Sequence, residues 1–152
     1  MAALRLEPVT RENVRAACLL RLRPGQEDLV APVAFSLAEA YVSPEIAWPR
    51  LIYDGDQLVG FVMVAFDPKN PSELLRAYLW RLNVDADHRG GGYGRFAVEE
   101  VCAEALRRGM PKLTVSYHPG ESGPEGLYER LGFHPTGEYN EGEVVAERLL
   151  SP

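Results

Sequence analysis

Two neighbouring stretches of the chain have contrasting hydrophobic periodicities. Residues 78–84 alternate between apolar and polar side chains, as a half-buried strand does. Further on, apolar side chains recur at the spacing of a helix with one buried face, at Val98, Val101, Cys102, Ala105 and Leu106. The two patterns predict a strand that ends at Val84 and a helix that runs to about Arg108, where Gly109 ends it.

The rest of the chain carries shorter periodic segments of both kinds. Thr10 is the expected N-cap of a first helix. Residues 51–53 and 58–66 flank Asp54-Gly55-Asp56-Gln57, which predicts a hairpin. Residues 113–117 alternate as a strand, so the strand, long helix and strand predict a right-handed parallel crossover. The other predicted elements are a strand over 4–8, a helix over 29–41, a short helix around Tyr128, and an antiparallel pair over 133–139 and 143–150.

Length and composition fit one soluble domain. The chain has 152 residues, ordinary apolar and charged fractions, and no repeat, low-complexity tract or linker. The order of the elements predicts a single α/β (α+β) domain over residues 1–152. The sequence has no apolar run of membrane-spanning length and no basic start followed by an apolar segment. We therefore expect a cytoplasmic protein that does not associate with membranes.

The charge balance bears on the partners of the protein. Sixteen Lys and Arg residues against 22 Asp and Glu residues give a net charge of −6. A nucleic acid needs a basic footprint, so it is not expected as the main partner. The excess of carboxylates is compatible with a small cationic substrate, and also with charge that only keeps the protein soluble.

Cysteine and histidine show no pattern of a metal or redox centre. Cys18 and Cys102 both lie among apolar residues of predicted helices, which indicates buried thiols rather than a disulfide. His88, His118 and His134 are scattered without the spacing of metal ligands. We therefore expect no metal site.

A glycine-rich stretch joins the predicted strand to the long helix, with the sequence His88-Arg89-Gly90-Gly91-Gly92-Tyr93-Gly94-Arg95. Such a turn presents unpaired main-chain N–H groups and the positive end of the helix dipole, which together bind phosphate. The dinucleotide fingerprint G-x-G-x-x-G fails because its third glycine falls on Arg95 or Ala97, and the P-loop fails because no Gly-Lys-Ser/Thr follows. The alternative is that the glycines only form a tight turn.

Two motifs in this chain resemble those of one family. The spacing Arg89-x-x-Gly92-x-Gly94 is similar to the pyrophosphate loop of the GCN5-related N-acetyltransferases. Residues 127–133 resemble the Leu-Tyr-x-x-x-Gly-Phe segment of the same family, although alone they also fit a core aromatic on a short helix. The resemblance extends over essentially the whole chain. It implies the acetyltransferase fold, a mixed central sheet with a splayed parallel strand pair flanked by helices.

The resemblance implies acetyl-CoA as cosubstrate and direct transfer of its acetyl group to a primary amine in a ternary complex. Main-chain groups of Leu82, Asn83 and Val84 would pair with the pantetheine arm, and one N–H would polarise the thioester oxygen. At the position of an asparagine in many relatives this chain has Glu121, so that contact is lost or passes to Ser122. The pyrophosphate would be bound by Arg89, Gly90, Gly91, Gly92, Tyr93, Gly94 and Arg95.

The same resemblance implies that Tyr128 is catalytic. In the family the tyrosine hydroxyl faces the coenzyme sulfur, where it returns a proton to the leaving thiolate as a general acid. The general base is left open among Glu39, Glu45, Asp85 and a chain of water molecules.

Within the family, the nearest likeness is to the bacterial spermine/spermidine acetyltransferases, through framework stretches such as 30–41 and 59–62. A polyamine has several cationic nitrogens, and Glu39, Glu138 and Glu143 are the carboxylates expected to bind it. An alternative is that the C-terminal glutamates protect an exposed sheet edge. Also open are another acceptor (an amino acid, an aminoglycoside or a protein amine), a non-catalytic CoA-binding sensor, and a homodimer.

Overall fold

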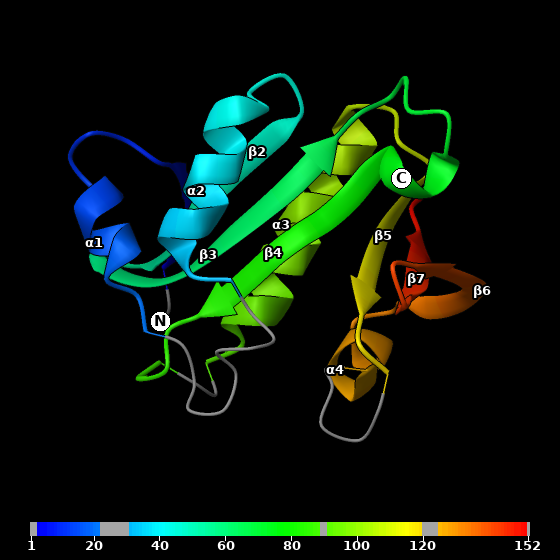
Figure 1. The fold of residues 1–152 in the computed structure, drawn as a ribbon. Coiled ribbons are helices and arrows are strands. Elements are labelled where there is room, and N and C mark those ends of the chain that lie inside the picture. The colour runs from blue at the N-terminus through cyan, green and yellow to red at the C-terminus, as the bar shows by residue number, and fades with distance from the viewer. Residues whose placement is uncertain (1–2, 22–30, 89–90, 120–124, 152) are drawn as a thin grey trace. The chain divides into compact units, whose positions relative to one another are not determined.

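The computed structural model describes residues 3–21, 31–88, 91–119 and 125–151 (Figure 1). The strands in this part of the chain are β1 (Leu4–Pro8), β2 (Ala47–Asp54), β3 (Gln57–Phe66), β4 (Ala77–Val84), β5 (Lys112–Tyr117), β6 (His134–Asn140) and β7 (Glu143–Leu149). The helices are α1 (Val14–Cys18), α2 (Val33–Val42), the 3-10 turn η1 (Glu73–Leu75), α3 (Tyr93–Arg107) and α4 (Glu125–Arg130).

The strands form one mixed sheet in the order β1-β2-β3-β4-β5-β7-β6. Strands β4 and β5 run parallel, with Tyr78 opposite Thr114, and α3 lies between them in the sequence. Strand β7 pairs antiparallel with both β5 and β6, so the closing hairpin extends the sheet. The predicted α/β fold class and the parallel strand pair are therefore confirmed.

The chain divides into two compact units. The first contains Met1–Val64 and Trp80–Glu100, and the second contains Ala65–Leu79 and Val101–Pro152. Strands β3 and β4 and helix α3 contribute residues to both units. The prediction of one domain over residues 1–152 stays a prediction.

The first unit has its core between two helices and the sheet. The buried members of this core, from α1, α2, β2 and β3, are Ala17, Val33, Leu51, Phe61 and Met63. Figure 1 shows α2 crossing in front of β3. Every residue of β3 from Val59 to Val64 is buried, including those between the core positions, so both faces of this strand are covered.

The second unit is built around the end of α3, strands β5 and β7, and the turn after α4. Its buried apolar residues include Val101, Ala105, Leu113, Val115, Leu131, Phe133, Val145 and Ala146. Gly109 (φ +79°) ends α3, and the Met110 N–H donates to the Ala105 carbonyl at 3.0 Å. Gly132 (φ +92°) ends α4 in the same left-handed conformation. The end of α3 occurs at the predicted glycine, Gly109.

The first two helices differ from the sequence prediction. Helix α1 begins at Val14, because the Asn13 side chain accepts the Thr10 N–H at 2.7 Å and closes a separate turn before the helix. Thr10 is therefore not the N-cap. Helix α2 begins at Val33, since a residue before proline avoids the helical conformation and Pro32 is the N-cap. The predicted start at Leu29 lies outside the described residues. Cys18 is exposed at the end of α1, so the prediction that it is buried is wrong, whereas Cys102 is buried.

Two further properties concern the described residues alone. None of their helices is long and apolar enough to cross a membrane. No group of three or more His, Cys, Asp or Glu side chains among them is placed to hold a metal ion.

Candidate active site

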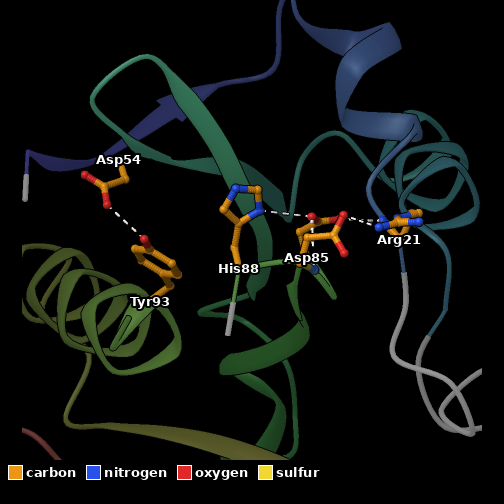
Figure 2. A network of polar contacts seen from close by, with 6 residues as sticks. Arg21, Asp54, Asp85, His88 and Tyr93 are labelled. Carbon is orange, nitrogen blue, oxygen red and sulfur yellow. Dashed lines mark hydrogen bonds and ion pairs between the residues drawn. The ribbon is translucent and has the colours of Figure 1, made fainter. Parts of the chain in front are cut away.

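The connection between β4 and α3 begins with a buried carboxylate, Asp85. Its N–H donates to the Val59 carbonyl at 2.8 Å, which fixes the end of β4 beside β3. One carboxylate oxygen accepts the Arg21 main-chain N–H at 2.8 Å, and the other lies 3.0 Å from His88 Nδ1 (Figure 2). Burial alone would raise the pKa of Asp85, but the hydrogen bonds from Arg21, His88 and Asp87 outweigh it and lower the pKa. A carboxylate that is charged at neutral pH therefore anchors the entry to the glycine turn.

The glycines at the start of α3 leave the main chain open. Gly92 has φ +74°, in the left-handed region, and a Cβ there would meet nothing within 4 Å. A Cβ on Gly94 would meet only a Leu82 methyl group, at 3.9 Å. Protein packing thus leaves room for a side chain at both positions. The first N–H groups of the helix have no acceptor within it and lie at the positive end of its dipole, so the turn fits an anion.

Tyr93, the first residue of α3, braces this turn with its side chain. The Tyr93 hydroxyl donates to Asp54 Oδ2 at 2.8 Å, which links the start of α3 to the end of β2 (Figure 2). This hydrogen bond to a carboxylate, together with burial, raises the pKa of Tyr93. A Cβ on Gly91 would lie 2.6 Å from the Tyr93 ring, so the ring requires glycine there. The Tyr93 hydroxyl is therefore committed to Asp54.

Strand β4 carries the three residues that are predicted to pair with the pantetheine arm. Asn83 is buried, whereas Leu82 and Val84 are half-buried. The Asn83 side-chain amide donates to the Ala31 carbonyl at 3.1 Å, so this side chain holds the segment that leads into α2. A Cβ on Gly60 of β3 would lie 2.6 Å from the Asn83 carbonyl oxygen, so the two backbones approach closely. The predicted role of the β4 main chain stays a prediction.

Tyr128 lies on α4 among aromatic side chains of the second unit. Its ring stacks on Tyr117, with centroids 5.8 Å apart and planes at 19°, and meets the Phe133 ring edge-on at 5.8 Å. Burial, and after it the neighbours Tyr78 and Glu143, raise the pKa of Tyr128 to about 12. The hydroxyl therefore remains protonated at neutral pH, a state in which it can donate a hydrogen bond.

A chain of polar side chains connects three strands of the second unit. The Tyr78 hydroxyl is hydrogen-bonded to Ser116 Oγ, and Ser116 Oγ donates to Glu143 Oε1 at 3.3 Å. The other oxygen of Glu143 lies 3.4 Å from His118 Nε2. Since Ser116 gives its only proton to the carboxylate, Tyr78 is the donor in the first hydrogen bond. Both hydroxyl protons therefore point towards Glu143.

The three carboxylates that are predicted to bind the amine have different surroundings. Glu39 forms an ion pair of 2.7 Å with Arg81 inside the first unit, so its charge is already matched. Glu138 is exposed on β6, where it lines a cavity of about 480 Å³ that is also lined by Lys112. Glu143 is the one of the three that contributes to the surroundings of the predicted catalytic tyrosine.

The remaining predicted residues divide into two groups. Those outside the described residues are Arg89, Gly90, Ser122 and Glu121. Arg95 is exposed on the first turn of α3, and Glu45 is exposed between α2 and β2. Of the other candidate bases, Asp85 is held charged by its hydrogen bonds and Glu39 is paired with Arg81.

The sequence analysis did not identify the contacts that join distant segments. It missed Tyr78, Ser116 and His118 as a set, and it missed Asp54 as the partner of Tyr93. Ser116 does carry a signal, because it is a hydroxyl residue on the strand face opposite to Leu113, Val115 and Tyr117. The alternation predicts the face on which Ser116 lies, but not which strand supplies its partner.

Comparison with known proteins agrees with these features. Residues 20–133 match the Acetyltransferase (GNAT) family. The chain therefore belongs to this family, as the resemblance of the glycine turn and the Tyr128 segment predicted.

The individual relatives have low sequence identity to this chain, and each aligns with only part of it. N-acetyltransferase family 8 member 2 of Rattus norvegicus is 30% identical over 96 residues, which cover 63% of this chain and 42% of that protein. L-2,4-diaminobutyric acid acetyltransferase of Shouchella clausii (strain KSM-K16) is 24% identical over 78 residues, or 51% of this chain and 42% of that protein. The chain thus spans less than half the length of these relatives.

Solved structures show the same fold. The PaiA N-acetyltransferase of Thermoplasma acidophilum, crystallised in complex with coenzyme A, superposes with a TM-score of 0.70 at 12% identity. The superposition covers 97% of this chain and 99% of that one. At this identity the likeness concerns the fold.

Proposed function

We propose that the protein transfers the acetyl group of acetyl-CoA to a primary amine of a small cationic acceptor. The observation that carries the proposal is the glycine turn at the start of α3, where Gly92 and Gly94 leave the main chain open to an anion. Membership of the acetyltransferase (GNAT) family supports it. So does Tyr128, a protonated hydroxyl in the segment that resembles the catalytic segment of the family.

Acetyl-CoA is the cosubstrate in this proposal. The first N–H groups of α3 bind its pyrophosphate, because the glycines allow close approach and the helix dipole stabilises the negative charge. By resemblance, Arg89 and Arg95 add charge-assisted hydrogen bonds. The main chain from Leu82 to Val84 pairs with the pantetheine arm. One N–H of that stretch polarises the thioester oxygen, an effect of about 3 kcal/mol in enzymes that use such donors.

The chemical step is direct attack of the neutral amine on the thioester. A free alkyl ammonium has a pKa of about 10.4 and must lose a proton before attack, and the departing thiol has a parent pKa of about 8.5. With a pKa of about 12, Tyr128 is a much weaker acid than that thiol. Complete transfer of its proton to the thiolate is therefore uphill, whereas a hydrogen bond stabilises the charge that develops on sulfur. We assign this donor role to Tyr128 in place of full general-acid catalysis.

The acceptor is proposed to carry more than one cationic nitrogen. A polyamine such as spermidine is the first candidate, from the likeness to polyamine acetyltransferases, with Glu138 and Glu143 on the β6–β7 hairpin as its carboxylates. The relative named for L-2,4-diaminobutyric acid makes a diamino acid the second candidate. Glu39 has less to offer a cationic acceptor because Arg81 already pairs with it. A cytoplasmic location and a homodimer stay predictions.

A thiol-release assay tests the proposal. The protein is mixed with acetyl-CoA and with spermidine, spermine, 2,4-diaminobutyrate, an aminoglycoside or a lysine peptide, and the free thiol of CoA is measured. Release with spermidine or spermine supports the polyamine, whereas release with 2,4-diaminobutyrate alone supports the diamino acid. Binding of CoA in calorimetry without release for any amine makes the protein a CoA-binding sensor. Absence of CoA binding overturns the proposal.

A further inference from the structure

We infer that Tyr78, Ser116 and Glu143 form a proton path that takes up the proton of the acceptor amine, with Glu143 as its terminal base. The inference rests on the proposed acetyl transfer and supplies the base that the sequence left open. All members of the path belong to the second unit. Tyr78 is on β4, Ser116 is on β5, Glu143 is the first residue of β7, and His118 directly follows β5.

The hydrogen bonds give the path a direction. The Tyr78 hydroxyl donates to Ser116 Oγ, and Ser116 Oγ donates to Glu143 Oε1 at 3.3 Å. A carboxylate accepts hydrogen bonds and donates none when it is charged, so the chain of donors ends there. His118 Nε2 lies 3.4 Å from the other oxygen of Glu143, and the His118 side chain is 59% exposed. The path therefore leads from a half-buried hydroxyl to a group in contact with solvent.

The path begins at Tyr78, an electrostatic neighbour of Tyr128, which is the residue proposed to face the sulfur. Tyr78 and Glu143 are the two neighbours whose electrostatic effects, after burial, contribute to the raised pKa of Tyr128. The proposed donor to the thiolate and the proposed proton path thus share one set of neighbours. In this proposal, an amine that attacks the thioester beside Tyr128 passes its proton to the Tyr78 hydroxyl.

Two of the other candidate bases, Asp85 and Glu39, are committed elsewhere. Asp85 accepts hydrogen bonds from the main-chain N–H groups of Arg21 and Asp87 and pairs with His88, which stabilise its charged form and weaken it as a base. Glu39 is paired with Arg81 at 2.7 Å. Glu143, in contrast, has no cationic side chain of Lys or Arg among its described contacts and receives one serine hydroxyl.

The proton balance of the step is complete. As the amine nitrogen forms its bond to the thioester carbon, its N–H proton moves to Tyr78 Oη, the Tyr78 proton moves to Ser116 Oγ, and the Ser116 proton moves to Glu143 Oε1. The C–S bond then breaks, and sulfur leaves with the electron pair as a thiolate that accepts a hydrogen bond from Tyr128. Glu143 passes the proton to water, either directly or through His118, so every side chain returns to its first state.

The test is the pH dependence of kcat in the Glu143→Gln variant, measured by thiol release at saturating amine. Weaker binding of the cationic acceptor raises KM and does not enter kcat. Loss of a general base lowers the rate by about 100-fold near pH 7.5. The loss should shrink to less than about tenfold near pH 10, because hydroxide ion becomes abundant enough to accept the amine proton in place of Glu143. A purely structural role would lower the rate by the same factor at every pH. Glu129→Gln removes the same charge from the exposed face of α4 and should stay within about twofold of wild type.

A second variant interrupts the path in its middle. Ser116→Ala should lower kcat with the same pH dependence as Glu143→Gln, and Ser116→Thr, which restores a hydroxyl on a strand, should recover most of it. The CoA affinity of all three variants should match wild type in calorimetry. Full activity of Ser116→Ala, or a loss in Glu143→Gln that is constant with pH, overturns the path and leaves the proposed acetyl transfer standing. If the wild-type protein binds CoA but acetylates none of the amines, the proposed acetyl transfer is wrong. The proton path, which depends on it, is then wrong as well.

Discussion

The start of helix α3 and the surroundings of Tyr128 are built in opposite ways. At α3 the sequence removes side chains, so that Gly92 and Gly94 leave main-chain N–H groups accessible, and Tyr93 braces the turn from the side. Around Tyr128 the sequence adds side chains, and the rings of Tyr117 and Phe133 enclose the tyrosine and help to raise its pKa. Fixed main-chain dipoles suit the binding of an anion, whereas desolvation by side chains controls which protonation state is present.

Because the two regions are built differently, mutations in them should change different properties of the enzyme. Substitutions at the start of α3 should alter the affinity for CoA with little effect on the chemical step. Substitutions around Tyr128 should alter turnover and the response to alkaline pH, with little effect on CoA affinity. A single variant that changed both CoA affinity and turnover would show that the two regions do not act separately.

Gly94→Val should have the largest effect. The added side chain occupies the room beside the first N–H groups of α3, where a Cβ would meet only a Leu82 methyl group at 3.9 Å. Loss of two hydrogen bonds to a charged phosphate, each about 1.5 kcal/mol, would weaken CoA binding by about 100-fold. Thermal stability should change little. Calorimetry with CoA and a melting curve measure the two effects.

Gly109→Ala is the matched control for that variant. Gly109 lies at the other end of α3 with φ +79°, and a Cβ there would meet nothing within 4 Å. Alanine in the left-handed conformation costs about 1 kcal/mol of stability, but CoA affinity should match wild type. Wild-type affinity in Gly94→Val would show that the coenzyme does not approach this turn.

The alkaline stability of wild type against Tyr128→Phe tests the buried hydroxyl. Tyrosine ionises near pH 10 in the unfolded chain and near pH 12 in the folded protein, so the folded state holds its proton longer. The resulting stabilisation is fully present below pH 10 and is lost as the pH rises towards 12, a change of up to about 2.7 kcal/mol. Urea unfolding of both proteins at several pH values gives the difference. Parallel curves would show that Tyr128 ionises normally in the folded state.

The same variant, Tyr128→Phe, should lower kcat by about tenfold to thirtyfold, because it removes one hydrogen bond to the developing thiolate. Loss of a full general acid would cost about 100-fold or more. The CoA dissociation constant should stay at the wild-type value, since the hydroxyl contributes to the transition state. Thiol-release kinetics under saturating acetyl-CoA measure kcat. An unchanged kcat would remove Tyr128 from the chemical step.

The fold was largely predictable from the sequence because its signals are local. The apolar spacing of α3, the alternation of β5 and the glycines at helix ends each depend on residues a few positions apart. The errors in helix boundaries occurred at the starts of α1 and α2, where one particular residue changed the expected helix start. Asn13 takes the Thr10 N–H and delays α1, and Pro32 delays α2 by restricting the residue before it.

The site was predictable in its residue types but less so in its contacts. The sequence identified Glu39, Tyr93 and Glu143, but their partners Arg81, Asp54 and Ser116 lie 42, 39 and 27 positions away along the chain. Hydrophobic periodicity predicts which face of a helix or strand a residue occupies. It does not predict which distant helix or strand packs against that face. Pairing of this kind decides whether a carboxylate is available to a substrate, as the ion pair of Glu39 shows.

Tyr93→Phe tests whether the Tyr93 hydroxyl only supports the glycine turn or contacts the coenzyme itself. The variant keeps the ring that covers Gly91 and loses the hydrogen bond to Asp54 Oδ2. We expect CoA affinity to fall by about fivefold, as for one lost hydrogen bond, because the turn is held less firmly. Calorimetry with CoA measures the change, and kcat at saturating acetyl-CoA should match wild type. A loss as large as that of Gly94→Val would mean that the hydroxyl contacts the coenzyme itself.

Glu39→Gln should have the smallest effect on catalysis. Glu39 and Arg81 have side chains that are 34% and 22% exposed, and their charges compensate each other within the first unit. The variant should change the KM for the amine by less than about twofold and lower the stability by about 1 kcal/mol, as for a partly exposed ion pair. Glu143→Gln, at a carboxylate without such a partner, provides the contrast in the same assay. A tenfold rise in KM for Glu39→Gln would show that the acceptor displaces Arg81 from Glu39, and that the first unit also binds the amine.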